Sequence, residues 1–309
     1  MKLSVRTALA VSLLGSSLFV ATVAQATTPK PTCVVSLSPS ATESLFAIGA
    51  GGEVKAVDRD SNFPVGKLPK TRIDALNPSV EAIAGVCGTV KGVAKKPDFV
   101  VISFDANNIK ANLTALGIRV IEQDAATSLA DAQDQIRSLG TLTGYSTRAN
   151  QVASALGTQV RNAIATVQSA AAKAKVRTST ISFYYELDPT LYSITSDTFI
   201  GSLLHQMGAT NVADAVAQSS DYGYPQLSRE YLVSANPKVI FLADTKCCSV
   251  NARMVASRTG FANVAAVKYH HVIGLDDDVA SRWGPRLGLL AEQLATALKA
   301  AIAQKSWTK

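Results

Sequence analysis

One segment near the middle of the chain, residues 147–175, constrains the fold more than any other feature. It contains no proline and a single glycine, Gly157, and it is rich in Ala, Val and Gln. As one helix rising about 1.5 Å per residue, it is about 40 Å long, which exceeds the thickness of an ordinary domain. We therefore expect a rigid helical connector between two folded units.

Short apolar runs alternate with amphipathic stretches on both sides of this connector. We expect strands at residues 34–37, 54–57, 99–103, 119–121, 178–184, 239–242 and 271–274. Helices are expected at residues 40–49, 79–84, 108–116, 129–142, 198–207, 228–234 and 288–303. This alternation is typical of parallel sheets covered by helices. The sequence predicts an α/β fold with two Rossmann-like lobes, each a parallel-type sheet flanked by helices, joined by one long backbone helix.

The start of the chain is typical of an export signal. Lys2 and Arg6 precede an apolar run over residues 8–23, the small-residue site Ala24-Gln25-Ala26 follows, and the first acidic residue is Glu43. A membrane anchor is the alternative, but the apolar run is shorter than the roughly 20 residues of a bilayer-spanning helix. We expect an exported protein, periplasmic or at the cell surface, that is soluble after signal cleavage.

These observations divide the chain into four parts. We expect a signal peptide at residues 1–26, an N-terminal α/β lobe at 33–146, the linking helix at 147–175 and a C-terminal α/β lobe at 176–309. The net charge of +7 does not indicate nucleic-acid binding, because acidic residues are interleaved with the basic ones. The apolar content of 47% and the charged content of 17% exclude a disordered chain.

Four cysteines lie in the expected mature chain. In an exported protein an even number favours disulfides. The pairing that keeps each bond within its own half is Cys33 with Cys87 and Cys247 with Cys248. Cross-half pairs and free thiols remain alternatives, because a bridge between adjacent cysteines requires a distorted peptide. The spacing does not match a CxxC or a His/Cys zinc site, and we expect no metal site.

Motifs for catalysis and for nucleotide cofactors are missing from the sequence. It has no GxxxxGK[ST] loop and no GxSxG elbow, and the glycines at 49–52 follow a helix instead of a strand. We therefore expect no cofactor and no enzyme activity. The alternative is an exported hydrolase or a thiol/disulfide enzyme that uses Cys247, or a serine, with His271.

The two halves share a short pattern. Ser79 and Glu81 open one expected helix, and Ser228 and Glu230 open another; each helix leads through a proline into a buried strand. The first copy carries about nine extra residues before its proline, Cys87 among them. The acids lie at equivalent positions of the two lobes. Ordinary helix chemistry is the alternative, since Glu is favourable near a helix N-terminus.

Ligands of open α/β sheets bind at loops that follow the strands. Several such loops carry hydroxyl, aromatic and charged groups, which suggests a mixed cleft suited to a large polar ligand. Plain helix capping at residues 38–42 and solvated surface loops are the alternatives. The candidate ligand-binding residues are Ser38, Pro39, Ser40, Arg59, Phe63, Tyr184, Tyr185, Tyr224, Asp278, Arg282 and Trp283.

An ordered set of segments runs from Cys33 to the last expected helix. It comprises residues 34–43 (VVSLSPSATE), 76–83 (LNPSVEAI), 96–101 (KPDFVV), 116–118 (LGI), 225–230 (PQLSRE), 236–237 (NP) and 281–286 (SRWGPR). In this set the chain resembles the ABC-importer substrate-binding proteins that take up cobalamin, ferric siderophores and haem. The resemblance covers essentially the whole expected mature chain.

The resemblance implies a bilobed fold with limited closure and a ligand held between the lobes. It also implies that Glu81 and Glu230, one per lobe, dock onto arginines of a dimeric ABC permease in the membrane. We expect a monomer that delivers a large metal chelate to this permease.

The sequence does not separate cobalamin from a ferric siderophore as the ligand. Tyr224 stands where cobalamin-binding members typically have tryptophan. Ferric siderophore members often place arginines in the cleft, and Arg59, Arg72, Arg253 and Arg282 are candidates for that role.

Overall fold

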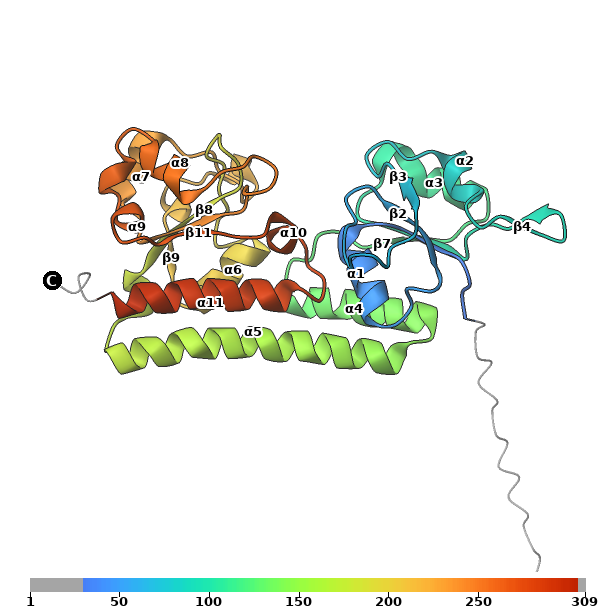
Figure 1. The fold of residues 1–309 in the computed structure, drawn as a ribbon, viewed down its shortest axis with the longest axis horizontal. Helices are drawn as coiled ribbons and strands as arrows, with labels where there is room; N and C mark the ends of the chain where they lie inside the picture. Colours follow the sequence, from blue (N-terminus) through green and yellow to red (C-terminus); the bar gives the residue numbers. More distant parts are fainter. Residues whose placement is uncertain (1–29, 305–309) are drawn as a thin grey trace, which may run out of the picture.

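A computed structural model describes residues 30–304 of the protein. Two α/β lobes stand side by side on the long helix α5 (Ser146–Ala174), as Figure 1 shows. The fold class predicted from the sequence is confirmed. The expected signal peptide, residues 1–26, lies outside the described residues.

The N-terminal lobe is built on a parallel sheet in the order β3-β2-β1-β6-β7. Its strands are β1 (Val34–Leu37), β2 (Val54–Asp58), β3 (Thr71–Ile73), β6 (Phe99–Ile102) and β7 (Val120–Glu122). Its helices are α1 (Pro39–Ala47), α2 (Val80–Ala84), η1 (Ala106–Asn108), α3 (Ile109–Ala115) and α4 (Leu129–Thr143). β1 and β6 are buried at every position, which agrees with the unbroken apolar runs of their sequences.

The C-terminal lobe has a four-stranded parallel sheet in the order β11-β10-β8-β9. Its strands are β8 (Ser182–Glu186), β9 (Thr210–Asn211), β10 (Val239–Leu242) and β11 (Val272–Gly274). Its helices are α6 (Phe199–Gln206), α7 (Arg229–Ala235), α8 (Ala252–Ser257), α9 (Ala265–Lys268), α10 (Asp277–Ala280) and α11 (Leu287–Ala303). Short 3-10 turns are η2 (Thr178–Thr180), η3 (Ala213–Ala215), η4 (Ser219–Asp221) and η5 (Phe261–Asn263).

The two sheets repeat one strand order. In chain order, the first strand of each lobe lies between the second and a later one: β1 lies between β2 and β6, and β8 lies between β9 and β10. Beyond β6 and β10, a further strand, β7 or β11, extends the sheet, and β3 is an additional edge strand of the N-terminal sheet. The strand order therefore reverses beside β1 and beside β8, and such a switch point is where open α/β sheets bind ligands, at the carboxyl ends of the strands.

The extra residues of the first half form an antiparallel hairpin, β4 (Thr89–Val90) and β5 (Val93–Ala94), which projects from the N-terminal lobe (Figure 1). A disulfide joins Cys87, just before the hairpin, to Cys33, just before β1, with their Cα atoms 6.0 Å apart. The predicted Cys33–Cys87 pairing is confirmed.

Helix α5 connects the lobes through an apolar stripe. Apart from the adjacent pair Leu156 and Gly157, its buried residues recur every three or four positions: Ala149, Ala153, Leu156, Gly157, Val160, Ala163, Val167 and Ala171. Helix α4 of the N-terminal lobe and helix α11 of the C-terminal lobe both pack on α5 (Figure 1). The helices α4 and α5 approach closely at Gly140, where an added Cβ would collide with the Cβ of Ala149. One continuous apolar core thus spans both lobes.

Candidate functional site

Two adjoining cavities lie between the lobes. The larger has a volume of about 670 Å³ and the smaller about 330 Å³. Both are lined by Ala125, Ala126, Thr198, Phe199 and Tyr224. Apart from Tyr185, which lies in β8 itself, the lining residues follow the carboxyl ends of strands, β7 in the N-terminal lobe and β8 to β11 in the C-terminal lobe. This is the edge at which the topology predicts a ligand.

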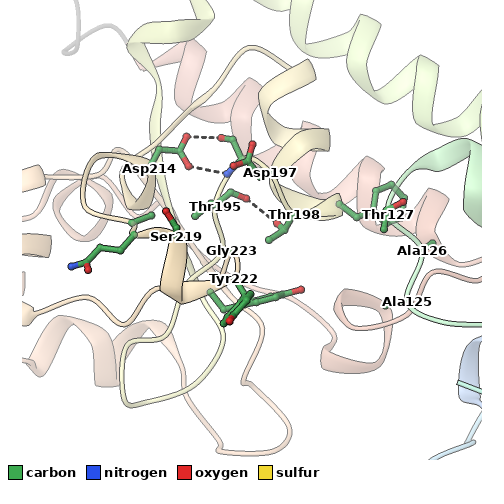
Figure 2. A pocket seen from close by; sticks show the side chains of 15 residues that line it. Ala125, Ala126, Thr127, Thr195, Asp197, Thr198, Asp214, Ser219, Tyr222 and Gly223 are labelled. Atoms are coloured by element: carbon green, nitrogen blue, oxygen red, sulfur yellow. Dashed lines mark hydrogen bonds between the residues drawn. The ribbon is translucent and has the colours of Figure 1, made fainter. Parts of the chain in front are cut away.

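The larger cavity has polar walls (Figure 2). Thr127 lies on the N-terminal lobe, and the C-terminal lobe supplies the loop from Thr195 to Phe199 and the segment around Tyr222. Asp197 and Asp214 are its charged residues, and no lysine, arginine or histidine is among the described residues that line it. The electrostatic potential inside this cavity is therefore negative.

The smaller cavity is more apolar. Its walls include the rings of Tyr185, Phe199, Tyr224 and Trp283. The indole Nε1 of Trp283 donates to Gln135 Oε1 at 2.9 Å, so the ring is held by the N-terminal lobe although it belongs to the C-terminal segment. Fixed aromatic walls of this kind suit a large, rigid ligand.

Arg282 is the only cation that lines either cavity among the described residues, and both terminal nitrogens of its guanidinium are engaged. Nη1 donates to Glu43 Oε1 and to Asn62 Oδ1, both at 2.8 Å. Nη2 donates to the Asp60 carbonyl at 2.9 Å and to Asp278 Oδ1 at 2.8 Å. The side chain is 7% exposed. Its hydrogen bonds therefore hold the two lobes together and leave no N–H of these two nitrogens for a ligand.

A second arginine completes this contact. Arg286 donates from Nε to Glu43 Oε2 at 2.9 Å and from Nη2 to Glu43 Oε1 at 2.6 Å. Glu43 is buried in α1 of the N-terminal lobe, whereas both arginines lie beside the start of α11. We call Glu43, Arg282 and Arg286 the interlobe ion cluster. The hydrogen bonds that Arg286 donates to Glu43 raise the pKa of Arg286, although burial opposes this shift.

Four of the candidate ligand-binding residues line the cavities: Tyr185, Tyr224, Arg282 and Trp283. The other seven are not among the residues that line them. Tyr184 lies in the core on the other face of β8, because neighbouring residues of a strand point to opposite faces. Asp278 accepts hydrogen bonds from Asn62, Lys246 and Arg282.

The candidates of the N-terminal lobe have structural partners. Ser38 is buried and caps α1 by accepting from the Ala41 N–H, and Pro39 is the next residue of that helix. Ser40 accepts from the Trp283 N–H at 3.2 Å. Arg59 pairs with Asp74 at the surface, and Phe63 lies under the guanidinium of Arg286, 4.4 Å from its ring centroid.

The sequence reasoning missed the loop from Thr195 to Phe199 and the turn at residues 125–127, which line the cavities. Both follow the carboxyl end of a strand, so strand topology is the signal that could have found them. Of the other arginines considered for the cleft, Arg72 donates to the Ser61 carbonyl at 2.6 Å and Arg253 lies on the exposed face of α8.

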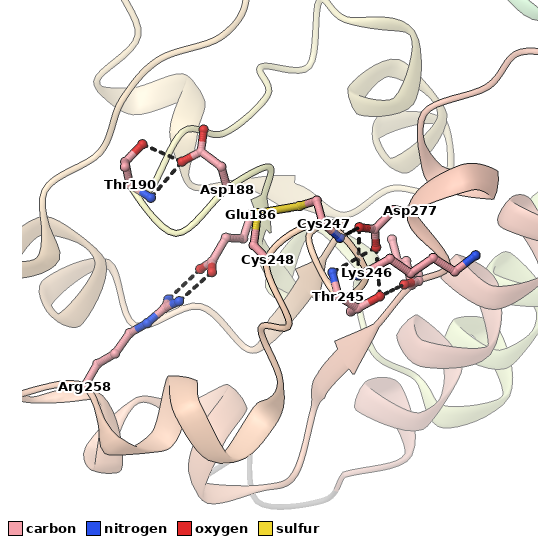
Figure 3. Close-up of a disulfide and its surroundings, with 10 residues drawn as sticks. Glu186, Asp188, Thr190, Thr245, Lys246, Cys247, Cys248, Arg258 and Asp277 are labelled. Carbon is pink, nitrogen blue, oxygen red and sulfur yellow. Dashed lines mark hydrogen bonds and ion pairs between the residues drawn. A yellow bond between two sulfur atoms is a disulfide. The ribbon is translucent and has the colours of Figure 1, made fainter. Parts of the chain in front are cut away.

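A second charged cluster lies in the C-terminal lobe (Figure 3). Arg258 donates from both terminal nitrogens to Glu186, each at 2.6 Å. Asp244, which follows β10, is fully buried, and its carboxylate oxygens have no hydrogen-bond partner in residues 30–304. Burial is the main cause that raises the pKa of Asp244 to about 7, and the neighbouring Glu186 contributes to the same shift. Burial and the charge of Glu186 also raise the pKa of Tyr184.

The loop after Asp244 carries a disulfide between Cys247 and Cys248, as expected from the sequence. Asp277 anchors this loop by accepting from the backbone N–H groups of Thr245, Lys246 and Cys247 at 2.8 to 2.9 Å (Figure 3). Cys247 is thus bonded to its neighbour, and His271 is buried at the start of β11, where burial lowers its pKa. Within the described residues, no group of three or more His, Cys, Asp or Glu side chains is arranged to hold a metal ion.

Glu81 and Glu230 occupy equivalent positions. Each is the second residue of its helix, after an N-cap serine that accepts from a backbone N–H: Ser79 from Ala82 and Ser228 from Tyr231. Both acids are exposed. Their helices, α2 and α7, lie on the two lobes on the side away from α5 and α11 (Figure 1).

Comparison with known proteins finds two similar sequences and one solved structure of similar fold. The chain is 28% identical over 274 residues to an uncharacterized ABC transporter substrate-binding lipoprotein of Bacillus subtilis (strain 168), covering 87% of this chain and 80% of the relative. It is 29% identical over 273 residues to the vitamin B12-binding protein of Salmonella choleraesuis (strain SC-B67), covering 86% and 89%. The apo periplasmic heme-binding protein of Roseiflexus sp. RS-1 shares its fold, with a TM-score of 0.71 at 22% identity over 87% of this chain and 98% of that one.

The periplasmic binding protein family model matches residues 34–279. The chain therefore belongs to the periplasmic binding protein family, and the predicted family is confirmed. This is a family of binding proteins, not of enzymes, and its members act outside the cytoplasm. Among residues 30–304, no helix has both the length and the apolar character needed to cross a bilayer.

The interlobe ion cluster gives a first prediction. Glu43→Gln removes the anion that buried Arg282 shares with half-buried Arg286, although Arg282 keeps Asp278, and breaking a buried ion pair on one side costs about 3–5 kcal/mol. The matched control Asp74→Asn removes the acid of an exposed pair with Arg59 and changes stability by about 1 kcal/mol or less. Urea unfolding followed by circular dichroism measures both; equal midpoints for the two variants contradict a stabilising role for the interlobe contact.

Asp244 gives a second prediction. Its pKa is raised in the folded state from an ordinary value of 3.8, so ionisation destabilises the fold increasingly as the pH rises from about 4 to about 7. Asp244→Asn removes this penalty. The melting temperature of the variant relative to wild type should therefore increase between pH 5 and pH 8, by the equivalent of about 1–3 kcal/mol. The exposed Asp134→Asn serves as the control, and a difference independent of pH disproves the assignment.

Proposed function

We propose that this protein is the extracytoplasmic substrate-binding component of an ABC importer and that it binds a cobalamin-type corrinoid between its lobes. The observation that carries the choice of ligand is the charge of the cleft. Its lining contains two aspartates and one arginine whose guanidinium already holds four acceptors. A cleft without an available cation disfavours ligands with several anionic groups, such as ferric catecholates or the two propionates of haem.

The shape and the relatives support the same ligand class. The cavities adjoin along one open cleft and are walled by aromatic rings, which suit a large macrocycle. Several relatives that match most of this chain are named vitamin B12-binding proteins. Tyr224 lines both cavities and supplies an aromatic face at the position where cobalamin-binding members typically have tryptophan.

The proposal that the protein delivers its ligand to a permease rests on two acidic residues, one on each lobe. Glu81 and Glu230 are exposed, occur in one local geometry, and lie on helices at the same side of the two lobes. A pair of carboxylates fixed in this way registers the protein on a cationic partner surface. We propose that a monomer, exported by residues 1–26, docks on the arginines of a permease dimer through these acids.

Ligand binding is tested with the oxidised protein that begins after Ala26. Trp283 lines the smaller cavity, so cyanocobalamin should quench its fluorescence and raise the melting temperature. A ferric hydroxamate, a ferric catecholate and hemin are compared at equal concentration, and Trp283→Phe is the control that removes the Trp283 contribution to the fluorescence, leaving that of Trp307, while calorimetry still reports binding. Binding of another chelate in preference to cyanocobalamin, or of none, refutes the corrinoid assignment.

Docking is tested separately. Glu81→Ala combined with Glu230→Ala should leave corrinoid affinity unchanged, because neither residue lines the cavities, and should abolish ligand uptake in cells or in proteoliposomes with the permease. The control pair Glu122→Ala and Glu292→Ala removes two exposed acids elsewhere. Weakened ligand affinity in the first pair, or normal uptake, contradicts the docking role.

A further inference from the structure

Thr195, one of the residues that line the larger cavity, carries a buried hydroxyl that lacks a partner within the described residues. Thr195 lines this cavity and is 6% exposed, and its Oγ1 forms no hydrogen bond within the described part of the chain. A buried polar group without a partner costs about 1–3 kcal/mol. Native proteins seldom leave such a group unsatisfied unless it has a use, and a bound ligand would satisfy it.

The backbone around this hydroxyl is fixed. The Thr195 N–H donates to the Gly223 carbonyl at 2.8 Å, and its carbonyl accepts from Thr198 Oγ1 at 2.8 Å. Ser196 donates from its N–H and its Oγ to the two carboxylate oxygens of Asp214, at 2.8 and 2.7 Å (Figure 2). Gly201 leaves room for the Thr195 carbonyl, which a Cβ there would strike. The hydroxyl is therefore held in place before any ligand arrives.

A free carboxylate lies two residues further along the loop. Asp197 lines the same cavity, is exposed, and forms no ion pair or hydrogen bond with any residue in 30–304. Asp214 adds a second negative charge, and no basic side chain is among the described residues of this cavity. One loop thus carries two kinds of hydrogen-bonding group. The Asp197 carboxylate is a charged acceptor, and the Thr195 hydroxyl can both donate and accept.

We propose that Thr195 and Asp197 form a subsite that selects ligands with peripheral carboxamide or ammonium groups and rejects ligands with carboxylates at the same place. An amide N–H donates to the Asp197 carboxylate, and the amide carbonyl accepts from the Thr195 hydroxyl. A ligand carboxylate at the same place is repelled by the Asp197 carboxylate, and no basic side chain among the described residues of this cavity offsets the repulsion. This inference rests on the proposed function, since the amide arms of a corrinoid are the groups that would occupy the subsite.

The experiment compares cyanocobalamin with its monocarboxylic acids, in each of which one peripheral amide is hydrolysed. For the wild-type protein at pH 7.5, calorimetry should show at least one monocarboxylate binding about tenfold or more weakly than cyanocobalamin. Asp197→Asn should reduce the ratio of the two affinities, cyanocobalamin over monocarboxylate, to about one, mainly by improving binding of the monocarboxylate. Added salt should shrink the wild-type ratio, because it screens the repulsion between the two carboxylates.

Two matched controls separate the subsite from general effects. Glu292→Gln removes an exposed charge on α11 and should leave the ratio unchanged. Thr195→Val should weaken binding of cyanocobalamin about fivefold to tenfold, whereas Thr166→Val on the exposed face of α5 should not. If Thr195→Val fails to fold, Asp197→Asn alone decides, because its side chain is exposed.

The outcomes distinguish this inference from the proposed function. Tight binding of cyanocobalamin with equal binding of every monocarboxylate overturns the subsite and leaves the corrinoid assignment intact. If Asp197→Asn keeps the same ratio of cyanocobalamin affinity to monocarboxylate affinity as the wild-type protein, the subsite is overturned in the same way. If no corrinoid binds at all, the assignment itself fails, and the subsite proposal fails with it.

Discussion

The arrangement of this molecule depends on one buried charge contact between its lobes. Glu43 of α1 accepts from Arg282 and Arg286, which lie beside the start of α11. Charges out of water are tolerated only when their partners are fixed, so this contact requires the two lobes to keep one relative position. The apolar stripe of α5 fixes the same position from the other side. The cleft lies between these two constraints and is therefore formed without a ligand.

The sequence was a good guide to the architecture because the relevant signals are local. A helix without breaks at α5, and buried apolar runs at β1, β6 and β10, are visible in the residues themselves. The repeated Ser-x-Glu pattern also proved to be one structure used twice. Short elements such as β9 and α10 escaped notice, since two to four residues carry too little periodicity to stand out from a loop.

The cleft was harder to predict, because side-chain direction and pairing are decided by tertiary contacts. Tyr184 and Tyr185 are adjacent in sequence, but only Tyr185 lines a cavity. Arg282 lines the smaller cavity, yet three of its four hydrogen bonds go to acceptors more than 200 residues away, in the N-terminal lobe. The basic balance of the whole chain gave no hint that the larger cavity is acidic, since net charge carries no information about which charges converge.

The β4–β5 hairpin interrupts the likeness of the two lobes. The lobes repeat a strand order and present an acid in the same way, but α2 leads into the hairpin whereas α7 leads directly to β10. The molecule is thus a pseudo-symmetric object with unequal ends. On any partner with two-fold symmetry, one half of the partner meets the end with the hairpin and the other half meets the end without it. Such a complex makes chemically identical subunits structurally different for as long as the protein stays bound.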